Sequence, residues 1–124
     1  MKILVVDDNS SLRMLMRMDF QELLGNDYIV LIAKDGEEAM QIVLNEENIK
    51  LVITDFHMPK KNGIELAEFI RQCCSKIKII IISSGTDQHI QDAARVVADL
   101  FSDKSDFLNT SDEKKKEIIF NFLK

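Results

Sequence analysis

The chain has 124 residues with a formal net charge of −5 at pH 7, and 46% of its residues are hydrophobic. This length and composition suit one globular domain with a two-layer or three-layer core, and the acidic balance argues against a nucleic-acid surface, which needs a cationic face. Asp7 and Asp8 interrupt the N-terminal apolar stretch before a signal peptide could form, and no apolar run reaches the length of a membrane span. The adjacent cysteines Cys73 and Cys74 lack the spacing of metal ligands. We therefore expect reduced thiols in a cytoplasmic protein that contacts neither membranes nor nucleic acid.

Five short apolar runs alternate with five segments of helical periodicity. The runs predict strands at residues 2–6, 28–33, 51–53, 76–82 and 100–102. The periodic segments predict helices at residues 11–24, 37–45, 64–74, 87–99 and 112–123, with loops at 83–86 and 104–106. Ser10 or Ser11 can cap the first of these helices, on which Leu15 falls in the apolar stripe. Strict alternation with short connections predicts a parallel sheet with right-handed crossovers and helices on both faces.

Charged and polar side chains follow four of the five predicted strands. Asp7 and Asp8 follow the first strand and Asp55 the third, while Ser83 follows the fourth and Lys104 lies just beyond the fifth. Because the carboxyl ends of parallel strands lie at one edge of a sheet, we expect these side chains to lie close together. Three crowded carboxylates repel one another unless a cation neutralises them, and oxygen ligands of this kind suit Mg²⁺.

The residue types at this edge indicate phosphoryl chemistry. An aspartate carboxylate can attack phosphorus and form an acyl phosphate, while a lysine and a hydroxyl can hold the phosphoryl oxygens. The sequence therefore predicts a Mg²⁺-assisted phosphoryl-acceptor site centred on Asp55. Plainer alternatives remain: Asp7 or Asp8 could cap a helix, Ser83 could be a loop hydroxyl, and Lys104 could be a solvated surface residue.

These residues stand in motifs that resemble those of a known family. The motifs are Ile-Leu-Val-Val-Asp-Asp at 3–8, Asp-x-x-Met-Pro-x-x-x-Gly at 55–63, Ile-Ile-Ser-Ser-Gly at 81–85, and Lys104. In this order and spacing they resemble the receiver domain of two-component response regulators, and the resemblance covers essentially residues 1–124. It implies a flavodoxin-like, doubly wound (βα)5 fold whose five-stranded parallel sheet has the order 2-1-3-4-5.

The resemblance also implies roles for single residues. Asp55 would be the phosphoacceptor, taking its phosphoryl group from a histidine kinase or a histidine phosphotransfer protein. Asp8, Asp55 and the backbone carbonyl of His57 would bind Mg²⁺, and Asp7 would join them directly or through water.

The resemblance further implies how phosphorylation is passed on. Ser83 and Lys104 would contact the bound phosphoryl group, and Phe101 holds the position of the aromatic switch residue. The switching surface would comprise three segments: residues 87–99, 100–102 and 112–123. Phosphorylation would make this surface gain or lose a downstream protein or an attached output domain. Such a module is a signalling domain, not an enzyme with a diffusing substrate, and it would be a monomer or a phosphorylation-dependent dimer.

Three departures from the family pattern affect the switch region. Ser105 stands where the family usually has a proline after the lysine, in a cis peptide. A cis non-proline bond costs about 2.5–4 kcal/mol, so we expect either strain there or a different presentation of Lys104. Residues 97–99 lack the family's glycine turn, and Phe101 lacks the hydroxyl of tyrosine, so any switch would act by packing.

Two other functions share parts of this pattern. A haloacid-dehalogenase-type phosphatase also uses an aspartate nucleophile and Mg²⁺, but it carries Asp-x-Asp on the first strand, where this chain has Asp-Asp-Asn at 7–9. A pseudo-receiver would be an interaction module without switching, and Ser105 keeps that alternative open. We also expect His57 to act through its backbone rather than its ring, and residues 114–116 to be a solvated helix face.

Overall fold

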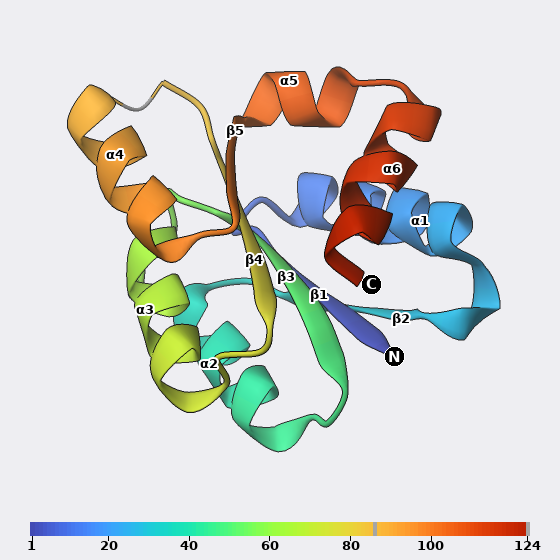
Figure 1. Ribbon diagram of the computed structural model, residues 1–124, viewed down its shortest axis with the longest axis horizontal. Coiled ribbons are helices and arrows are strands. Elements are labelled where there is room, and N and C mark those ends of the chain that lie inside the picture. The colour runs from blue at the N-terminus through green and yellow to red at the C-terminus, as the bar shows by residue number, and fades with distance from the viewer. Residues whose placement is uncertain (86, 124) are drawn as a thin grey trace.

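The computed structural model of the protein describes residues 1–85 and 87–123. Thr86, which the sequence places in the loop after the fourth strand, and Lys124 lie outside the described residues. The five strands are β1 (Lys2–Val6), β2 (Ile29–Ala33), β3 (Ile49–Asp55), β4 (Lys78–Ser83) and β5 (Leu100–Asp103). Neighbouring strands are parallel, in the order β2-β1-β3-β4-β5, which confirms the predicted sheet (Figure 1).

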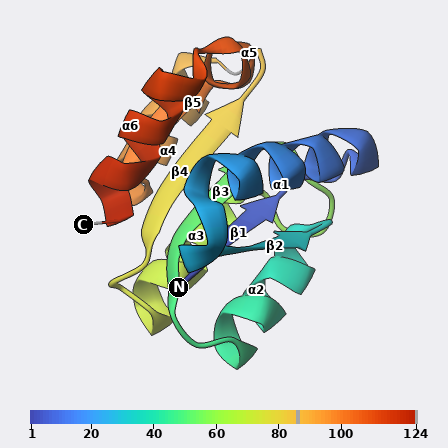
Figure 2. The same ribbon diagram turned by 90° about the vertical axis from the view of Figure 1, so that its right-hand side faces the viewer.

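Helices cover both faces of the sheet. They are α1 (Ser10–Leu24), α2 (Gly36–Asn45), α3 (Gly63–Cys73), α4 (Gln88–Val97), α5 (Lys104–Asn109) and α6 (Asp112–Leu123), with a 3-10 turn η1 (Gly25–Asp27) after α1. The two ribbon views place α2, α3 and α4 on one face and α1, α5 and α6 on the other (Figures 1 and 2). The predicted loop at residues 104–106 is wrong, because α5 begins at Lys104. In the part of the chain that the structure describes, every helix is too short or too polar to cross a lipid bilayer.

The strands bury apolar side chains on both faces of the sheet. The fully buried strand residues on the α2–α4 face include Leu4, Val6, Val52, Ile79 and Ile81. The fully buried strand residues on the face covered by α1, α5 and α6 include Ile3, Val5, Leu51, Ile53, Ile80 and Ile82. Aliphatic, largely β-branched runs that are buried on both sides are typical of the inner strands of a parallel sheet, and each such side chain contributes about 1.5–3 kcal/mol on burial. The three inner strands β1, β3 and β4 therefore give the carboxyl edge of the sheet a rigid base.

The start of α1 differs by one residue from the predicted cap. Asn9, rather than Ser10 or Ser11, caps the helix, because its Oδ1 accepts a hydrogen bond from the N–H of Leu12 at 3.0 Å. Leu15 is 61% exposed, so its predicted place in the buried stripe is wrong. The buried residues of α1 are Met16, Phe20 and Leu24, which face the sheet at helical spacing.

The last helix, α6, docks against α1 and the sheet. Ile119 is fully buried, and the ring of Phe120 lies edge-on to that of Tyr28 with 6.0 Å between centroids. Lys115 is also buried, and its Nζ pairs with Asp19 of α1 at 2.9 Å. The predicted solvated face at residues 114–116 is therefore wrong for its middle residue.

Candidate functional site

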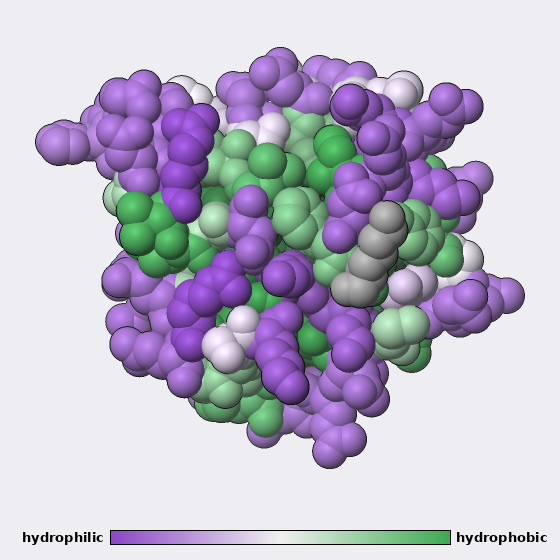
Figure 3. Space-filling view, in the orientation of Figure 1, coloured by the Kyte–Doolittle hydropathy of each residue, from purple (hydrophilic) through white to green (hydrophobic). Residues whose placement is uncertain are grey.

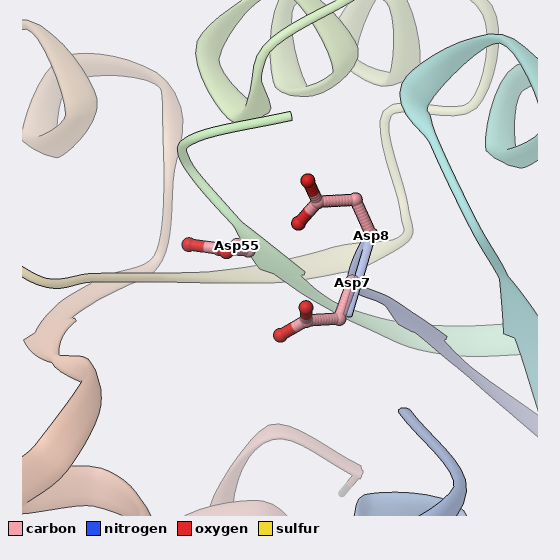
Figure 4. A group of neighbouring side chains, drawn as sticks. All are labelled: Asp7, Asp8 and Asp55. Atoms are coloured by element: carbon pink, nitrogen blue, oxygen red, sulfur yellow. The ribbon is translucent and has the colours of Figure 1, made fainter. Parts of the chain in front are cut away.

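Three aspartates meet at the carboxyl edge of the sheet. Asp7 and Asp8 directly follow β1, and Asp55 is the last residue of β3. Val6 lies opposite Thr54 in the register of these neighbouring strands, so Asp7 and Asp55 come to lie side by side. Oxygen atoms of the three carboxylates all lie within 4.8 Å of one another (Figure 4). The predicted convergence of the acidic residues is confirmed.

Lys104 brings a cation to the two buried carboxylates. Its Nζ lies 2.7 Å from Oδ2 of Asp7 and 3.0 Å from Oδ2 of Asp55. Asp7 is 0% and Asp55 6% exposed, whereas Asp8 lies exposed at the rim of the cluster. Three carboxylates face this one ammonium group, so a further cation bound among them would relieve their mutual repulsion.

Burial and neighbouring charges shift the pKa values of Asp55 and Lys104. Burial raises the pKa of the Asp55 carboxyl and the charge of Asp7 adds to that effect, against the opposing influence of Lys104 and of a hydrogen bond from the His57 backbone. Burial disfavours the charged form of Lys104, but its bonds to the two carboxylates outweigh burial and raise its pKa. Lys104 therefore stays cationic, while the Asp55 carboxylate takes up a proton more readily than that of an ordinary surface aspartate.

One buried oxygen at this edge, Oγ of Ser83, has no hydrogen-bond partner among the described residues. By contrast, Oδ2 of Asp7 pairs with the ammonium of Lys104, and its other oxygen accepts a bond from the N–H of Asn9 at 2.9 Å. Buried polar atoms in proteins are normally bonded, so the Ser83 hydroxyl indicates room for an external partner. Carboxylate oxygens are the ligands that Mg²⁺ prefers, and the donor set fits that ion.

A recess of about 280 Å³ adjoins the cluster on the side of β4 and β5. Ser83 lies one position beyond Ile82, which pairs with Asp55 in the sheet. The recess is lined by Ser83, Gly85, Gln91, Arg95, Phe101 and Asp103. The ring of Phe101 is half-buried, and the guanidinium carbon of Arg95 lies 5.4 Å from its centroid. Seen from this side, apolar atoms show between the hydrophilic surfaces of α4 and α6 (Figure 3).

The loop after β3 approaches the cluster with its backbone. The side chain of His57 is exposed, and its ring lies edge-on to that of Phe56 with 4.7 Å between centroids. A backbone role for His57 as a metal ligand stays a prediction. At Gly63, a Cβ atom would come within 2.7 Å of the Asp55 carbonyl oxygen, so only glycine lets α3 begin directly behind the cluster.

Lys104 is presented by a helix instead of a proline turn. It is the first residue of α5, and the N-cap Asp103 accepts a bond from the N–H of Asp106 at 3.0 Å. Every peptide bond among the described residues is trans, including the one before Ser105. Of the two alternatives that Ser105 left open, a different presentation of Lys104 is the one found.

Sequence reasoning missed two residues that support the cluster. Arg13, one turn into α1, donates a hydrogen bond from its guanidinium to the carbonyl oxygen of Asp7 at 2.8 Å. Phe107 of α5 is 3% exposed, and its ring lies edge-on to that of Phe20 with 6.3 Å between centroids. An arginine in a first helical turn carries no distinctive signal, whereas an Asp at 103 followed by Asp106 is a helix-start pattern that could have been recognised.

Comparison with known proteins gives a consistent match. The model of the response regulator receiver domain family matches residues 3–111. A chemotaxis protein CheY homolog of Campylobacter jejuni is 41% identical over 71 residues, which cover 57% of this chain and 53% of that protein. The match thus spans about half the length of this relative. Chemotaxis protein CheY1 of Helicobacter pylori is 36% identical over 86 residues, which cover 68% of each chain.

Solved structures give the same result over nearly the whole chain. The response regulator protein TrrA from Thermotoga maritima, in complex with Mg(2+)-BeF, is 31% identical. It superposes with a TM-score of 0.80, covering 98% of this chain and 97% of that one.

Proposed function

The chain belongs to the family of response regulator receiver domains, and we propose that Asp55 is the residue through which it is switched by phosphorylation. One observation supports this above the others: Asp55 Oδ2, the cation of Lys104 and the carboxylate of Asp7 lie within one ion-paired cluster at the carboxyl edge of the sheet. Such a cluster provides a nucleophile, a positive charge for a phosphoryl oxygen and ligands for a metal ion.

The proposed donor is a phosphohistidine on a histidine kinase or a histidine phosphotransfer protein. A carboxylate oxygen of Asp55 attacks phosphorus, the P–O bond forms as the P–N bond breaks, and the electron pair stays on the imidazole nitrogen. Lys104, which now pairs with Asp55, transfers its hydrogen bond to a phosphoryl oxygen. The unpartnered Ser83 hydroxyl donates to another. The product is an acyl phosphate on Asp55.

The proposed cofactor is Mg²⁺. Asp7, Asp8, Asp55 and the backbone carbonyl of His57 would hold it, and Asp7 binds either directly or through water. When bound, the ion supplies charge neutralisation for the carboxylates and the incoming phosphoryl group. The grouping of one oxygen from each carboxylate within 4.8 Å supports a ligand role for these residues.

The proposed output is a change on the surface of α4, β5 and α6. Phosphorylation would draw Ser83 towards the phosphoryl group and let the Phe101 ring enter the adjoining recess. This surface would then gain or lose a downstream protein, an attached output domain or a second copy of the chain. Helix α6 takes the place that the family's fifth helix has, because α5 is an additional turn of helix before it.

The proposal covers the whole of residues 1–124 as one receiver unit. Helix α6 extends beyond the matched residues 3–111, and its fully buried Ile119 packs in the same core as β1 and β3. We also place the protein in the cytoplasm, where thiols stay reduced, because Cys73 and Cys74 are both free cysteines.

The test is transfer of radiolabel from acetyl phosphate, with Mg²⁺ present. We expect labelling of the wild type, loss of label on adding EDTA, and no label on Asp55→Asn. Asp92→Asn, on the exposed side of α4, makes the same change of charge away from the site and should label normally. Label retained on Asp55→Asn would refute the proposal. Steady turnover of a generic phosphate ester would instead support the phosphatase alternative.

A further inference from the structure

The position of Lys104 depends on the short helix α5. Lys104 is the first residue of this helix, and the Asp103 cap fixes the backbone there through its bond to the N–H of Asp106. A lysine side chain has four rotatable bonds and a large rotamer entropy. A short path from its Cα to the carboxylates is therefore maintained only if the helix that carries it is itself held in place.

The buried side chain of Phe107 is the main apolar anchor of α5, and Leu108 packs beside it, partly buried, against the same core. Phe107, one helical turn after Lys104, is the buried residue of α5 and is 3% exposed. Its ring packs edge-on against Phe20, which is fully buried in the middle of α1. Edge-to-face aromatic pairs fix both distance and orientation, so the Phe20 ring determines where α5 lies.

Helix α1 also fixes the ion partner of Lys104. Its N-cap Asn9 donates its N–H to Oδ1 of Asp7, and Arg13 in its first turn bonds the Asp7 carbonyl oxygen. Lys104 and Asp7 lie 2.7 Å apart, and both are therefore held in position by contacts with the same helix, α1. Displacement of α5 along or away from α1 would change this distance directly.

We propose that Phe107 is a positioning residue, which holds Lys104 at the site by packing against Phe20. In the family pattern a proline after the lysine restricts the backbone, and here Ser105 imposes no such restriction. The helix cap at Asp103 and the anchor at Phe107 take over that task. This inference rests on the proposed function, because it concerns how Lys104 is delivered to the phosphoryl group.

The first test compares phosphorylation rates with acetyl phosphate and Mg²⁺. Phe107→Ala should lower the rate constant about tenfold, since small displacements of a positioned group have effects of this order. Mg²⁺ affinity measured by calorimetry should stay unchanged, because Phe107 does not contact the aspartates. Phe107→Leu fills most of the same space and should recover most of the rate. If Phe107→Ala fails to fold, the leucine variant still tests the inference, because its rate should then lie between those of the wild type and Lys104→Ala.

A matched control separates positioning from general stability. Phe120→Ala removes the other edge-to-face pair on this face, with Tyr28, and that pair does not adjoin Lys104. Because Phe120 is only partly buried, this variant should destabilise the protein less than Phe107→Ala does, and it should leave the phosphorylation rate unchanged. An equal loss of rate in both variants would overturn the inference.

A double-mutant cycle tests whether Phe107 acts through Lys104. In a Lys104→Ala background, Phe107→Ala should cause no further loss of rate, because the group that it positions is already gone. A further loss equal to that in the wild-type background would overturn the inference.

Nuclear magnetic resonance of the lysine ammonium groups tests the positioning of Lys104 separately from the phosphorylation of Asp55. The Lys104 signal should report its ion pair in the wild type and in Phe120→Ala, and lose it in Phe107→Ala. An unchanged signal in Phe107→Ala would overturn the inference whatever the phosphorylation assay shows. Label on Asp55→Asn, with the expected change in this signal, would refute the proposed function and leave the positioning intact.

Discussion

Each end of the sheet holds an aspartate paired with a cation, and the two pairs are built differently. At the carboxyl edge, Lys104 lies 3.0 Å from Asp55. At the opposite edge, where β4 and β5 begin, Arg71 lies 2.7 Å from Asp99. The pKa of Asp55 is raised, chiefly by burial. Burial acts on Asp99 too, but the bonds that it accepts outweigh burial and lower its pKa.

The Asp99 pair is bonded to the backbone of the protein from both sides. Arg71 donates to the carbonyl oxygens of Val97 and Ile77 at 2.9 and 3.0 Å as well as to Asp99. Asp99 also accepts the N–H of Ile79 at 2.8 Å, which joins α3, β4 and the start of β5. A network of this kind ties distant segments of the chain together and stabilises the fold.

The Asp55 pair lies beside excess negative charge and a buried hydroxyl that has no partner in the described part of the chain. Asp7 adds a second buried carboxylate, and Oγ of Ser83 is buried without a hydrogen-bond partner among residues 1–85 and 87–123. Since both edges of the sheet hold an ion pair, an ion pair alone does not identify a functional site. An excess of one charge and unpaired polar atoms at a strand end are the features that distinguish it.

The largest expected effect is on phosphoryl transfer, in the variant Lys104→Ala. Loss of the cation that pairs with Asp55 should lower the phosphorylation rate about 10²-fold, as loss of a single transition-state donor does. Mg²⁺ binding should be retained, because the three carboxylates remain. Single-turnover labelling measures the rate, with Lys114→Ala on the exposed side of α6 as control. A rate equal to that of the wild type would mean that Lys104, like Arg71, only stabilises the fold.

The next effect is on stability, in the variant Asp99→Asn. Loss of the charged acceptor should lower the free energy of unfolding by about 1–2 kcal/mol at neutral pH. Because the pKa of Asp99 is lower in the folded state, its contribution is complete above the unfolded value near 3.9 and is lost as the pH falls through the folded value. Urea titrations of both proteins at several pH values measure this difference. A gap that persists undiminished at acid pH would contradict the role of the ionised carboxylate.

Asp55→Asn should change stability in the opposite direction. Without Mg²⁺, removal of a buried charge next to Asp7 should raise the free energy of unfolding by about 0.5–2 kcal/mol, within the ordinary range of single substitutions. The pKa of Asp55 is raised in the folded protein, so this gain is absent below the unfolded value, grows as the pH rises from the unfolded to the folded value, and is complete above the folded value. The same titrations measure it in the presence of EDTA. Destabilisation at neutral pH would mean that the bonds to the Asp55 carboxylate outweigh the cost of burying its charge, as they do for Asp99.

The smallest expected effect belongs to Arg95→Ala in the recess beside Ser83. The contact of its guanidinium with the Phe101 ring is worth about 0.5–1 kcal/mol at an exposed site. We expect a loss of stability of that order with no change in the phosphorylation rate, because Arg95 does not contact the aspartates. Arg95→Lys should restore part of the stability. A large loss of rate would place Arg95 within the acceptor site itself.

The carboxyl edge could be predicted from sequence because its geometry follows from topology. Once the strands are parallel, Asp7, Asp8 and Asp55 must come together at one edge, whereas the position of Lys104 also depends on how α5 packs. The two buried faces of the sheet follow from the apolar runs in the same way, whereas the strand order is implied by the resemblance to the receiver family.

The remaining features depend on contacts between distant segments, which local patterns do not specify. Helix α5 is six residues long, and it is held by the contact of Phe107 with Phe20 more than by its own propensity. Lys115 stands in a run of lysines and yet is buried, because Asp19 lies opposite it on α1. The pairing of Arg71 with Asp99 likewise spans two β-α units and has no motif.

The most direct test of the central claim is to locate the acyl phosphate on the chain. Protein incubated with acetyl phosphate and Mg²⁺ is reduced with borohydride, which converts an aspartyl phosphate to homoserine, and its peptides are then sequenced by mass spectrometry. The account predicts reduction at position 55 alone, absent in the presence of EDTA. Reduction at position 7 or 8, or none at all in the phosphorylated protein, would contradict it.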